Sequence, residues 1–505
     1  MTGPEKRYYK VFIGKLAPGA GRDQKALFDA IAAMETFDEA SLLIRFQGQR
    51  SLGHFTTIKH RLYDAVLRSL AAFHTENSVD ARLDRLLHQV DILHDKALYS
   101  DADRLLTTAR RLAETHGKHI CLLRILRYEQ RALERDNYAH ATPQAVAELL
   151  VEGHDAVEQE GAIQALWNLK SKVFMGLYRN GQARNAQAIA EVDELIKHPL
   201  LSDQNTLHSP RASFLFHHIR GAANFATGKV EACGHHLKEA LDVLETNQGH
   251  FKEDPNLAFS TLSNLIYVHV HLGEYQLAQD LLKEFRTMPG RWEMPETADL
   301  DLKLFATSTS LELTIHNRLG AFDKVMDLLA MVERGLEKYG DDLSPIRKAS
   351  IFYQVAYAHF GAGKPDIAIR WLHRLLNDIR IDESAEIVCF ARILNLLAYL
   401  DARELGLLPY ALRNTARFLS TRDRMHRFEP ILLAMVRKLM KARTPENRIG
   451  IHRGFLESIL PLENDPFERT VFDHLDPIAW AESRITGRPF AELVQERARR
   501  HVFAA

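Results

Sequence analysis

The 505-residue chain has little cysteine, no excess of either charge and no long apolar run. Its three cysteines, Cys121, Cys233 and Cys389, lie too far apart for a disulfide framework or a thiolate metal cage, and they are typical of a reducing compartment. Lysine and arginine total 65 against 66 acidic residues, and this balance argues against a chain that coats nucleic acid.

The sequence also lacks a membrane signal. Residues 1–7 have no apolar core of the secretory type, and the most apolar later stretch, 387–400, is short and contains Arg392. Because 46% of the residues are hydrophobic and 26% are charged, the chain can bury a sizeable core. We expect a cytoplasmic protein without a membrane span.

What the sequence does contain is a turn that recurs at a nearly constant interval. The turn consists of a glycine, an aromatic or aliphatic residue two positions later and a small residue five positions later. Ala97 and Asn137 begin degenerate copies, and the clearer copies begin at Gly181, Gly228, Gly273, Gly320, Gly363 and Gly406, with spacings of 47, 45, 47, 43 and 43 residues. This count predicts about eight helix-turn-helix units.

Each part of the turn has a physical reason. Glycine adopts positive φ without a Cβ clash, so it can end one helix and reverse the chain, and the small residue lets the second helix approach the first. A proline precedes the turn glycine by 18 residues in Ser209-Pro210, Asp254-Pro255 and Ser344-Pro345. This arrangement predicts an N-cap followed by a first-turn proline, and a first helix of about 17 residues.

The segments after each turn show the periodicity of amphipathic helices, as in Leu277, Leu281, Leu282 and Phe285, and no strand pattern of useful length interrupts them. A helix pair cannot bury both of its apolar faces alone, so successive pairs must stack. Over about residues 80–425 the turns resemble the tetratricopeptide repeat (TPR), although the period exceeds that family's 34 residues and its first-helix tryptophan is missing; HEAT-type repeats are the structural alternative. The resemblance implies an all-α, TPR-like α-solenoid.

We predict three parts: an N-terminal helical cap (1–75), the TPR-like α-solenoid (76–425) and a C-terminal helical cap (426–505). Helices are expected near 24–34, 38–46 and 55–74, after a glycine and proline break at 17–21. Near the C-terminus, two short helices anchored by Trp480, Phe490 and Leu493 are expected on either side of Gly487.

Both ends resemble an uncharacterised family of bacterial tetratricopeptide-like proteins, a resemblance that implies the fold alone. It is carried by residues 5–10, 37–40, 59–64 and 480–492.

Charge is distributed unevenly near the C-terminus. Residues 412–454 contain eleven Lys/Arg and three acids, whereas residues 455–482 contain seven acids and one arginine. We expect the acidic segment to cover the basic one, because end segments of repeat arrays commonly supply a polar closing face. A site for an acidic partner is the alternative.

No motif in the sequence indicates catalysis. The 25 histidines include the adjacent pairs His217-His218 and His235-His236, whose members point to different helix faces. His88, Asp91 and Asp95 share a helix face, which we interpret as solvated surface rather than a metal site. P-loop and nucleophile-elbow patterns are missing. We therefore predict no catalytic residue, no cofactor and no metal.

In a tetratricopeptide-like stack the first helices line a concave groove. Tyrosine and arginine are typical of binding hot spots there, although each tyrosine could instead pack within the stack. The facing positions, carried across unit by unit, identify as candidate binding residues Tyr178, Arg179, His218, Tyr267, His271, Asn317, Arg318, Tyr353, Tyr357 and Arg403.

The first functional hypothesis is a non-enzymatic scaffold or adaptor that binds a peptide or helix of a protein partner in this groove. The alternative is a ligand-sensing regulator whose residues 22–75 contact DNA through Lys59, His60, Arg61 and Arg68, although this segment lacks a dense basic stripe. A metal-dependent enzyme that uses the histidine-rich surface is a third, less supported hypothesis.

Overall fold

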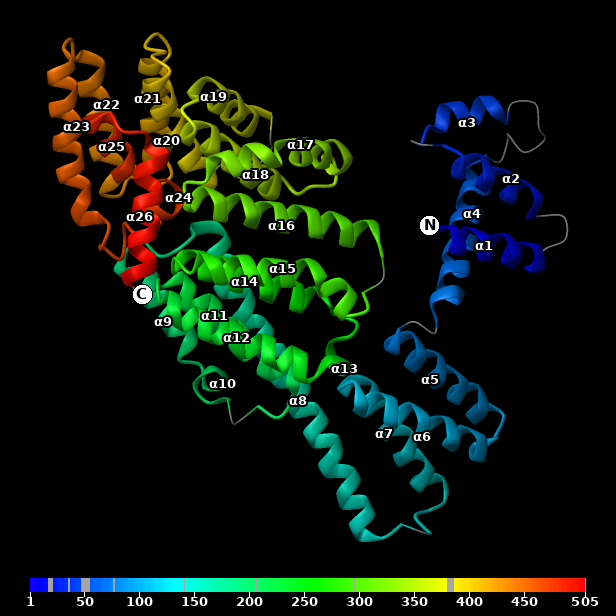
Figure 1. Cartoon of the computed structure of the whole chain (residues 1–505). Coiled ribbons are helices and arrows are strands. Elements are labelled where there is room, and N and C mark those ends of the chain that lie inside the picture. The colour runs from blue at the N-terminus through cyan, green and yellow to red at the C-terminus, as the bar shows by residue number, and fades with distance from the viewer. Residues whose placement is uncertain are drawn as a thin grey trace. The chain divides into compact units, whose positions relative to one another are not determined.

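All regular structure in the described part of the chain is helical (Figure 1), as the sequence predicts. The computed structural model describes residues 1–16, 21–34, 37–46, 55–75, 78–139, 141–204, 207–294, 296–378 and 386–504. Most of the predicted glycine and proline break at 17–21 lies outside these residues. None of the helices within these ranges is long and apolar enough to cross a membrane.

The chain divides into two compact units, residues 1–157 and 158–505. The boundary lies inside α8 (Pro143–Asn180), a single helix of 38 residues. The repeat count predicts two helices here, and that prediction is wrong. No proline interrupts residues 144–180, and the three glycines within the helix cost only about 1 kcal/mol each, so the helix continues. The predicted limits at residues 75 and 425 stay predictions.

The first unit begins with four helices around a small core. They are α1 (Gly3–Leu16), α2 (Gly21–Ala32), α3 (Glu39–Arg45) and α4 (Phe55–His74). The last three match the predicted helices within a few residues. α1 was not expected, because several basic residues interrupt the apolar pattern of its sequence. Its buried face is formed by Tyr9 and Ile13.

The DNA-contacting alternative depends on four residues of α4. Arg61, Arg68 and His60 are exposed, whereas Lys59 donates a hydrogen bond of 2.8 Å to Glu39 on α3. One of the four candidate contacts is therefore engaged within the bundle. Binding to DNA stays an untested prediction.

Three further helices complete the first unit: α5 (Val79–Asp95), α6 (Tyr99–Thr115) and α7 (His119–Arg135). Ala97 joins α5 to α6 with φ 56°, and Ala102 is fully buried, as the degenerate turn predicts. The turn at Gly117, with φ 60°, does not fit the repeated pattern, because Leu122 holds the position of the small residue.

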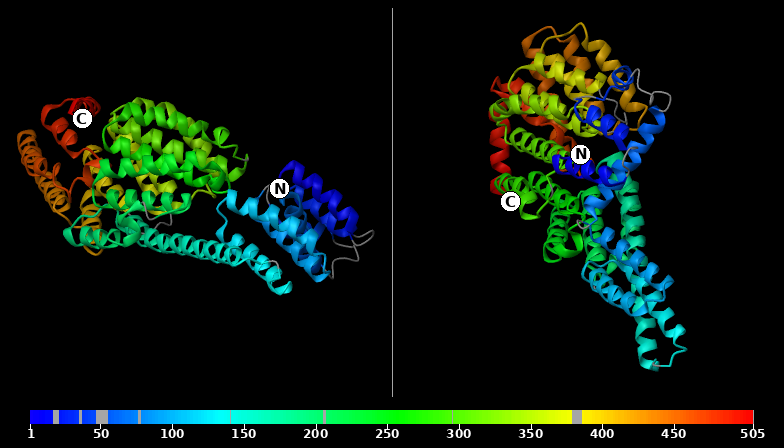
Figure 2. Two further views of the ribbon diagram at one scale, coloured as in Figure 1. Left: turned by 90° about the horizontal axis from the view of Figure 1, so that it is seen from below. Right: turned by 90° about the vertical axis from the view of Figure 1, so that its right-hand side faces the viewer.

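The second unit contains a series of antiparallel helix pairs, each packed on the next (Figures 1 and 2). The helices that correspond to the predicted first helices are α11 (Pro210–Ala226), α14 (Asn256–His271), α16 (Ala298–Arg318), α18 (Pro345–Gly361) and α20 (Glu386–Asp401). Their successors are α12 (Val230–Thr246), α15 (Tyr275–Arg291), α17 (Phe322–Tyr339), α19 (Pro365–His373) and α21 (Leu408–Ser420). The short helices α9 (Ala186–Ile196) and α10 (Pro199–Ser202) precede α11, whereas α13 (Gln248–Phe251) lies between α12 and α14 and a π-helix (Arg374–Asp378) follows α19.

The predicted turns form at five glycines, whose φ angles are positive: Gly181, Gly228, Gly273, Gly320 and Gly363. The small residues after four of them are buried, namely Cys233, Ala278, Val325 and Ala368, but Ala186 is exposed. At the last copy the prediction is wrong, because Arg403, not Gly406, has positive φ (60°).

The predicted helix starts are also confirmed in part. Ser209 accepts a hydrogen bond from the Ala212 amide and Pro210 follows it, as an N-cap should. Ser344 precedes Pro345 without a side-chain cap. At α14 the N-cap is Pro255, and Asp254 instead pairs with Arg211. The Asp254 cap is therefore a wrong prediction, because a nearby guanidinium binds the carboxylate.

Five helices form the C-terminal end: α22 (Phe428–Lys441), α23 (Pro445–Ile459), α24 (Thr470–His474), α25 (Pro477–Thr486) and α26 (Phe490–Ala504). Gly487, with φ 74°, separates α25 from α26 as predicted. Trp480, Phe490 and Leu493 are buried in one core with α18 and α20. The C-terminal helices therefore pack into the second unit.

Candidate functional site

The most prominent feature of the second unit is a C-terminal segment, residues 463–476, that contacts the C-terminal ends of α14 and α16 and the C-terminal half of α18. We call it the crossing segment; it includes α24, which lies beside α16 in Figure 1. Four of the predicted groove residues contact it: His271, Arg318, Tyr353 and Tyr357. The structure thus brings these predicted residues together around the chain's own peptide.

These residues form hydrogen bonds with main-chain atoms of the crossing segment. Arg318 donates to the Phe472 carbonyl, and the Tyr353 hydroxyl donates to the His474 carbonyl at 2.9 Å. The Asp476 amide donates to the Tyr357 hydroxyl at 3.2 Å. Such contacts hold a peptide without depending on its side chains.

One carboxylate adds charge to this contact. Asp473 lies 3.2 Å from His271 Nδ1 and 3.1 Å from an Arg318 nitrogen, and its side chain is 9% exposed. Burial alone would raise the pKa of Asp473, but the charges of His271 and Arg318 and the hydrogen bond from His271 outweigh burial and lower this pKa well below its usual range. Asp473 is therefore ionised at neutral pH.

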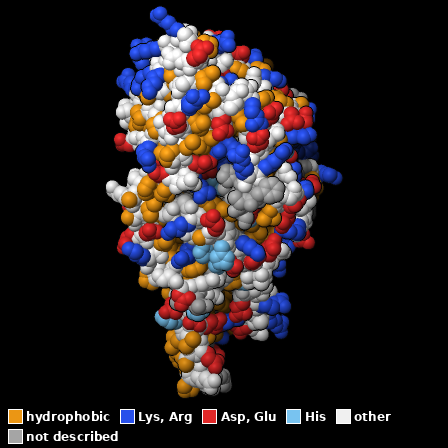
Figure 3. Space-filling view, turned by 60° about the vertical axis from the view of Figure 1, so that its left-hand side comes forward, with side chains coloured by type: hydrophobic (Ala, Val, Ile, Leu, Met, Phe, Trp, Pro, Cys, Tyr) orange, Lys and Arg blue, Asp and Glu red, His pale blue; other side chains and the backbone are white. Residues whose placement is uncertain are grey.

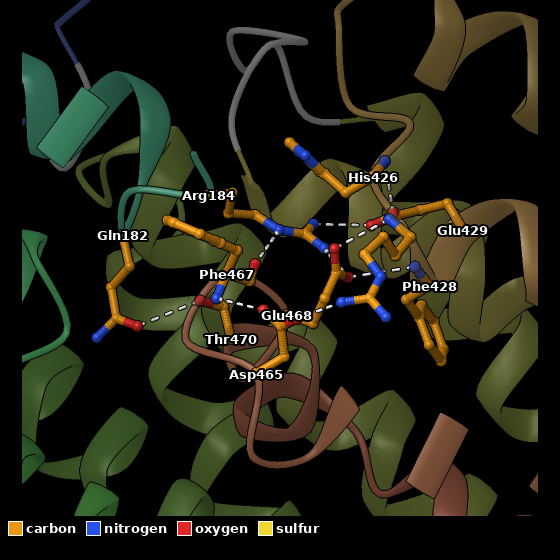
Figure 4. A network of polar contacts seen from close by, with 10 residues as sticks. Gln182, Arg184, His426, Phe428, Glu429, Asp465, Phe467, Glu468 and Thr470 are labelled. Carbon is orange, nitrogen blue, oxygen red and sulfur yellow. Dashed lines mark hydrogen bonds and ion pairs between the residues drawn. The ribbon is translucent and has the colours of Figure 1, made fainter. Parts of the chain in front are cut away.

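A second anchor lies at the other end of the crossing segment (Figure 4). Arg184, just before α9, donates to Glu429 of α22 and to Glu468 at 2.7 Å each, and to the Phe467 carbonyl at 3.0 Å. Glu468 also accepts hydrogen bonds from the amides of Arg427 and Phe428, at the start of α22. Acceptors at a helix N-terminus satisfy amides that have no partner within the helix. This network joins three distant parts of the sequence.

Two cavities lie beside the crossing segment. The larger, of about 730 Å³, lies near the first turns of α12 and α15 and is bounded on the opposite side by α26. The smaller, of about 270 Å³, lies among α8, α11, α12 and α14. Gln182, His271, Asp473 and His474 line both. Each cavity falls within or just below the range of ~300–1,000 Å³ that is usual for ligand sites.

The other predicted groove residues are distributed unequally. Asn317 lines the larger cavity together with Arg318 and Tyr357, whereas Tyr178, His218 and Tyr267 line the smaller one. Arg179 is exposed, and its carbonyl accepts a hydrogen bond from Arg424. Arg403 is exposed in a turn and lines neither cavity.

Three further residues that hold the crossing segment were not expected from the sequence. Gln182 accepts from Thr470, Arg184 binds Glu468, and Arg497 of α26 binds Asp476 and Glu463. Arg184 and its two glutamates are 245 and 284 positions apart, so no spacing rule could relate them. The only available signal was the cluster of acids in residues 455–482.

The acidic segment covers the basic segment 412–454 only in part. Asp465 pairs with Arg427, but Glu463, Asp473 and Asp476 pair with arginines elsewhere. The exposed basic residues of α21–α23 and their turns include Arg413, Arg417, Arg437, Lys438, Lys441 and Arg443. Figure 3 shows Lys and Arg side chains gathered at the top of one face, where these helices lie in Figure 1.

The histidine-rich surface contains no assembled metal site in the described part of the chain, where no three His, Cys, Asp or Glu side chains are arranged to hold an ion. His217 Nδ1 lies 3.1 Å from His236 Nδ1 across α11 and α12. Asp91 accepts a hydrogen bond from Tyr128. His88, Asp91 and Asp95 are exposed, and their interpretation as solvated surface rather than a metal site stays a prediction.

Two buried histidines make stability depend on pH. Burial, followed by the charge of Lys170, lowers the pKa of His218 to about 3. Burial, followed by the charges of Arg484 and Arg448, lowers the pKa of His452 to about 4. The usual pKa is about 6.5, so between these values the unfolded chain binds more protons and stability falls as pH falls. Each histidine should therefore lower the free energy of unfolding by about 1 kcal/mol when the pH falls from 6 to 5.

Urea unfolding at several pH values measures this effect. We expect the double variant His218→Gln/His452→Gln to lose about 2 kcal/mol less than the wild type between pH 6 and pH 5. The depressed pKa of Asp473 acts only below its usual range, near pH 4, and does not contribute to this interval. Parallel pH profiles for the two proteins would contradict the expectation.

A comparison with models of known protein families finds no match for this chain, and a search of curated proteins finds no significant match.

Proposed function

We propose that the chain is a non-enzymatic scaffold of TPR-like solenoid architecture that binds a segment of a partner protein at the inner face of its second unit. The observation that supports this function is the binding of the chain's own crossing segment there. Main-chain carbonyls of this segment accept hydrogen bonds from Arg184, Arg318 and Tyr353. A surface that binds one peptide through its main chain has the chemistry to bind another.

The regular helix pairs support the solenoid part of the proposal. The turn glycines recur every 43–47 residues, and α11, α12, α15 and α18 each contain 17 residues. Equal pairs that pack only on their neighbours form a quasi-one-dimensional array. Such an array offers the ends and inner faces of its first helices to a ligand.

The partner would bind beside the crossing segment rather than replace it. The segment leads directly into α25, where Ile478, Ala479 and Trp480 are buried, so its release would expose part of the core. The larger cavity stays open between the segment, α26 and the turns after α11 and α14. Exposed charged side chains at its edge, Glu231, Arg469 and Arg500, can orient a peptide.

Affinity purification of the full chain, followed by mass spectrometry, tests this function. In the variant Glu231→Arg/Arg469→Glu/Arg500→Glu, three exposed charges of the cavity are reversed without breaking a buried contact. We expect a partner captured by the wild type to be lost by at least about tenfold, the loss that about 1.4 kcal/mol produces.

The control variant Arg413→Glu/Lys438→Glu reverses exposed charges on α21 and α22, outside the cavity. It should capture the partner at the wild-type level. Retention of the partner by the cavity variant, or equal loss in both variants, would contradict binding at this site.

A further inference from the structure

The smaller cavity has the walls of a site for a small molecule. Apolar and aromatic side chains enclose most of it, including Phe174 and Leu177 of α8, Phe225 of α11 and Tyr267 of α14. The exposed Tyr178 and Asn264 line its outer part. A volume of about 270 Å³ suits a molecule with a single ring.

The described lining of this cavity carries acidic side chains and no basic ones, apart from histidine. Glu386 and Asp473 line it, and its described lining contains no lysine or arginine. Asp473 is already bound by His271 and Arg318. Glu386, in contrast, is approached by His474 at 3.5 Å, beyond good hydrogen-bond geometry, and its side chain is 21% exposed. Among the described residues, this mostly buried carboxylate has His474 as its one ion-pair partner, and it lines the cavity.

The position of this carboxylate depends on Gly181. A Cβ on Gly181 would lie 2.5 Å from a carboxylate oxygen of Glu386, so the carboxylate packs against bare main chain. The two carboxylates also act on Tyr267, an aromatic residue that lines the cavity. Burial raises the pKa of Tyr267, and the charges of Asp473 and Glu386 raise it further. This end of the cavity therefore favours positive charge.

His218 on α11 supplies the second polar feature. The residue is 5% exposed, and its Nδ1 atom is buried without a hydrogen-bond partner among the described residues. Burial and the nearby charge of Lys170 lower its pKa to about 3, so the ring is neutral. A buried polar atom without a partner is costly, and a ligand hydroxyl satisfies it once the His218 ring turns Nδ1 toward the cavity that this residue lines.

We propose that the smaller cavity binds a small organic cation: an ammonium group against Glu386, and an aromatic ring among Phe174, Phe225 and Tyr267 that carries a hydroxyl toward His218. Aromatic faces attract cations, and a hydrogen bond to a charged group is stronger than a neutral one. This site is independent of the proposed partner segment, because it needs no other protein.

Isothermal titration calorimetry with the full chain at neutral pH tests the proposal. The probes share one ring and differ in charge and hydroxyl: tyramine, 2-phenylethylamine, 2-phenylethanol and 3-phenylpropionate. We expect tyramine to bind most tightly, the two amines to bind about tenfold or more tighter than the neutral alcohol, and the anion not to bind.

Two variants identify the site. Glu386→Gln preserves the size of the side chain and should weaken the amines by about tenfold or more, with the alcohol changed by less than about twofold. Glu404→Gln removes one exposed carboxylate from the turn after α20, outside both cavities, and should leave all affinities unchanged.

The His218 contact has its own test. His218→Phe, which preserves a ring, should abolish the preference for tyramine over 2-phenylethylamine. Absence of amine binding at millimolar concentration, equal affinities for amine and anion, or amine affinity unchanged by Glu386→Gln would each overturn the proposal.

Discussion

Replacement of Arg184 by alanine is expected to lower the free energy of unfolding of the second unit by about 3–5 kcal/mol, the usual cost of breaking a buried ion pair. The Arg184 side chain is 6% exposed, and those of Glu429 and Glu468 are 3% and 2% exposed. Without the guanidinium, two carboxylates stay buried close together. The crossing segment loses its contact with the start of α9 as well.

Tryptophan fluorescence during urea unfolding measures this loss in the second unit alone, because all four tryptophans follow residue 157. Arg427→Ala is the matched control. Arg427 also binds an acid of the crossing segment, Asp465, but its side chain is 64% exposed. Its removal should cost about 0–1 kcal/mol, as for other exposed ion pairs. Equal losses in the two variants would show that burial does not decide the contribution of these contacts.

The second large effect is expected at Trp480, the first turn of α25. Its side chain is 1% exposed, and its ring packs against His452 and Phe455 of α23. Trp480→Ala should lower the free energy of unfolding by about 3–5 kcal/mol, because it removes a large buried side chain and leaves a cavity. Circular dichroism during urea unfolding follows this change without relying on the lost indole.

The variant Trp480→Phe separates the contribution of side-chain packing to stability from that of the indole hydrogen bond. The indole nitrogen donates to Asp401 at 3.1 Å, and Arg484 binds the same carboxylate at 2.6 Å. Because Arg484 still satisfies Asp401 in this variant, we expect less than half of the loss seen with alanine. A phenylalanine variant as unstable as the alanine variant would assign the effect to the hydrogen bond rather than to packing.

The sequence predicted local features well where one residue type decides the outcome. Gly228 and Gly273 adopt the positive φ expected of them, and Cys233 and Ala278 are buried where close helix contact requires a small side chain. The same reasoning failed at Gly406, because Arg403 tolerates the left-handed conformation and ends α20 first. Local rules state which backbone conformations a residue can adopt, but a neighbouring residue can adopt the same conformation instead.

Four of the ten candidate groove residues contact the crossing segment, but the segment that they contact was not predicted. His271, Arg318, Tyr353 and Tyr357 were identified by their positions at corresponding places of successive repeats. The peptide that they bind begins more than 100 residues later in the same chain, and it was expected to lie over the basic segment 412–454. A periodic pattern shows which face a helix presents and does not show which distant segment covers that face.

The sequence by itself therefore determined most of the helices and most of their turns, because these depend on neighbours within a few residues. Only the tertiary structure decided that residues 463–476 contact α14, α16 and α18 and leave two cavities beside them. Such contacts join Arg184 to Glu468 across 284 positions. Their formation depends on burial and charge in the assembled unit, which no local pattern encodes.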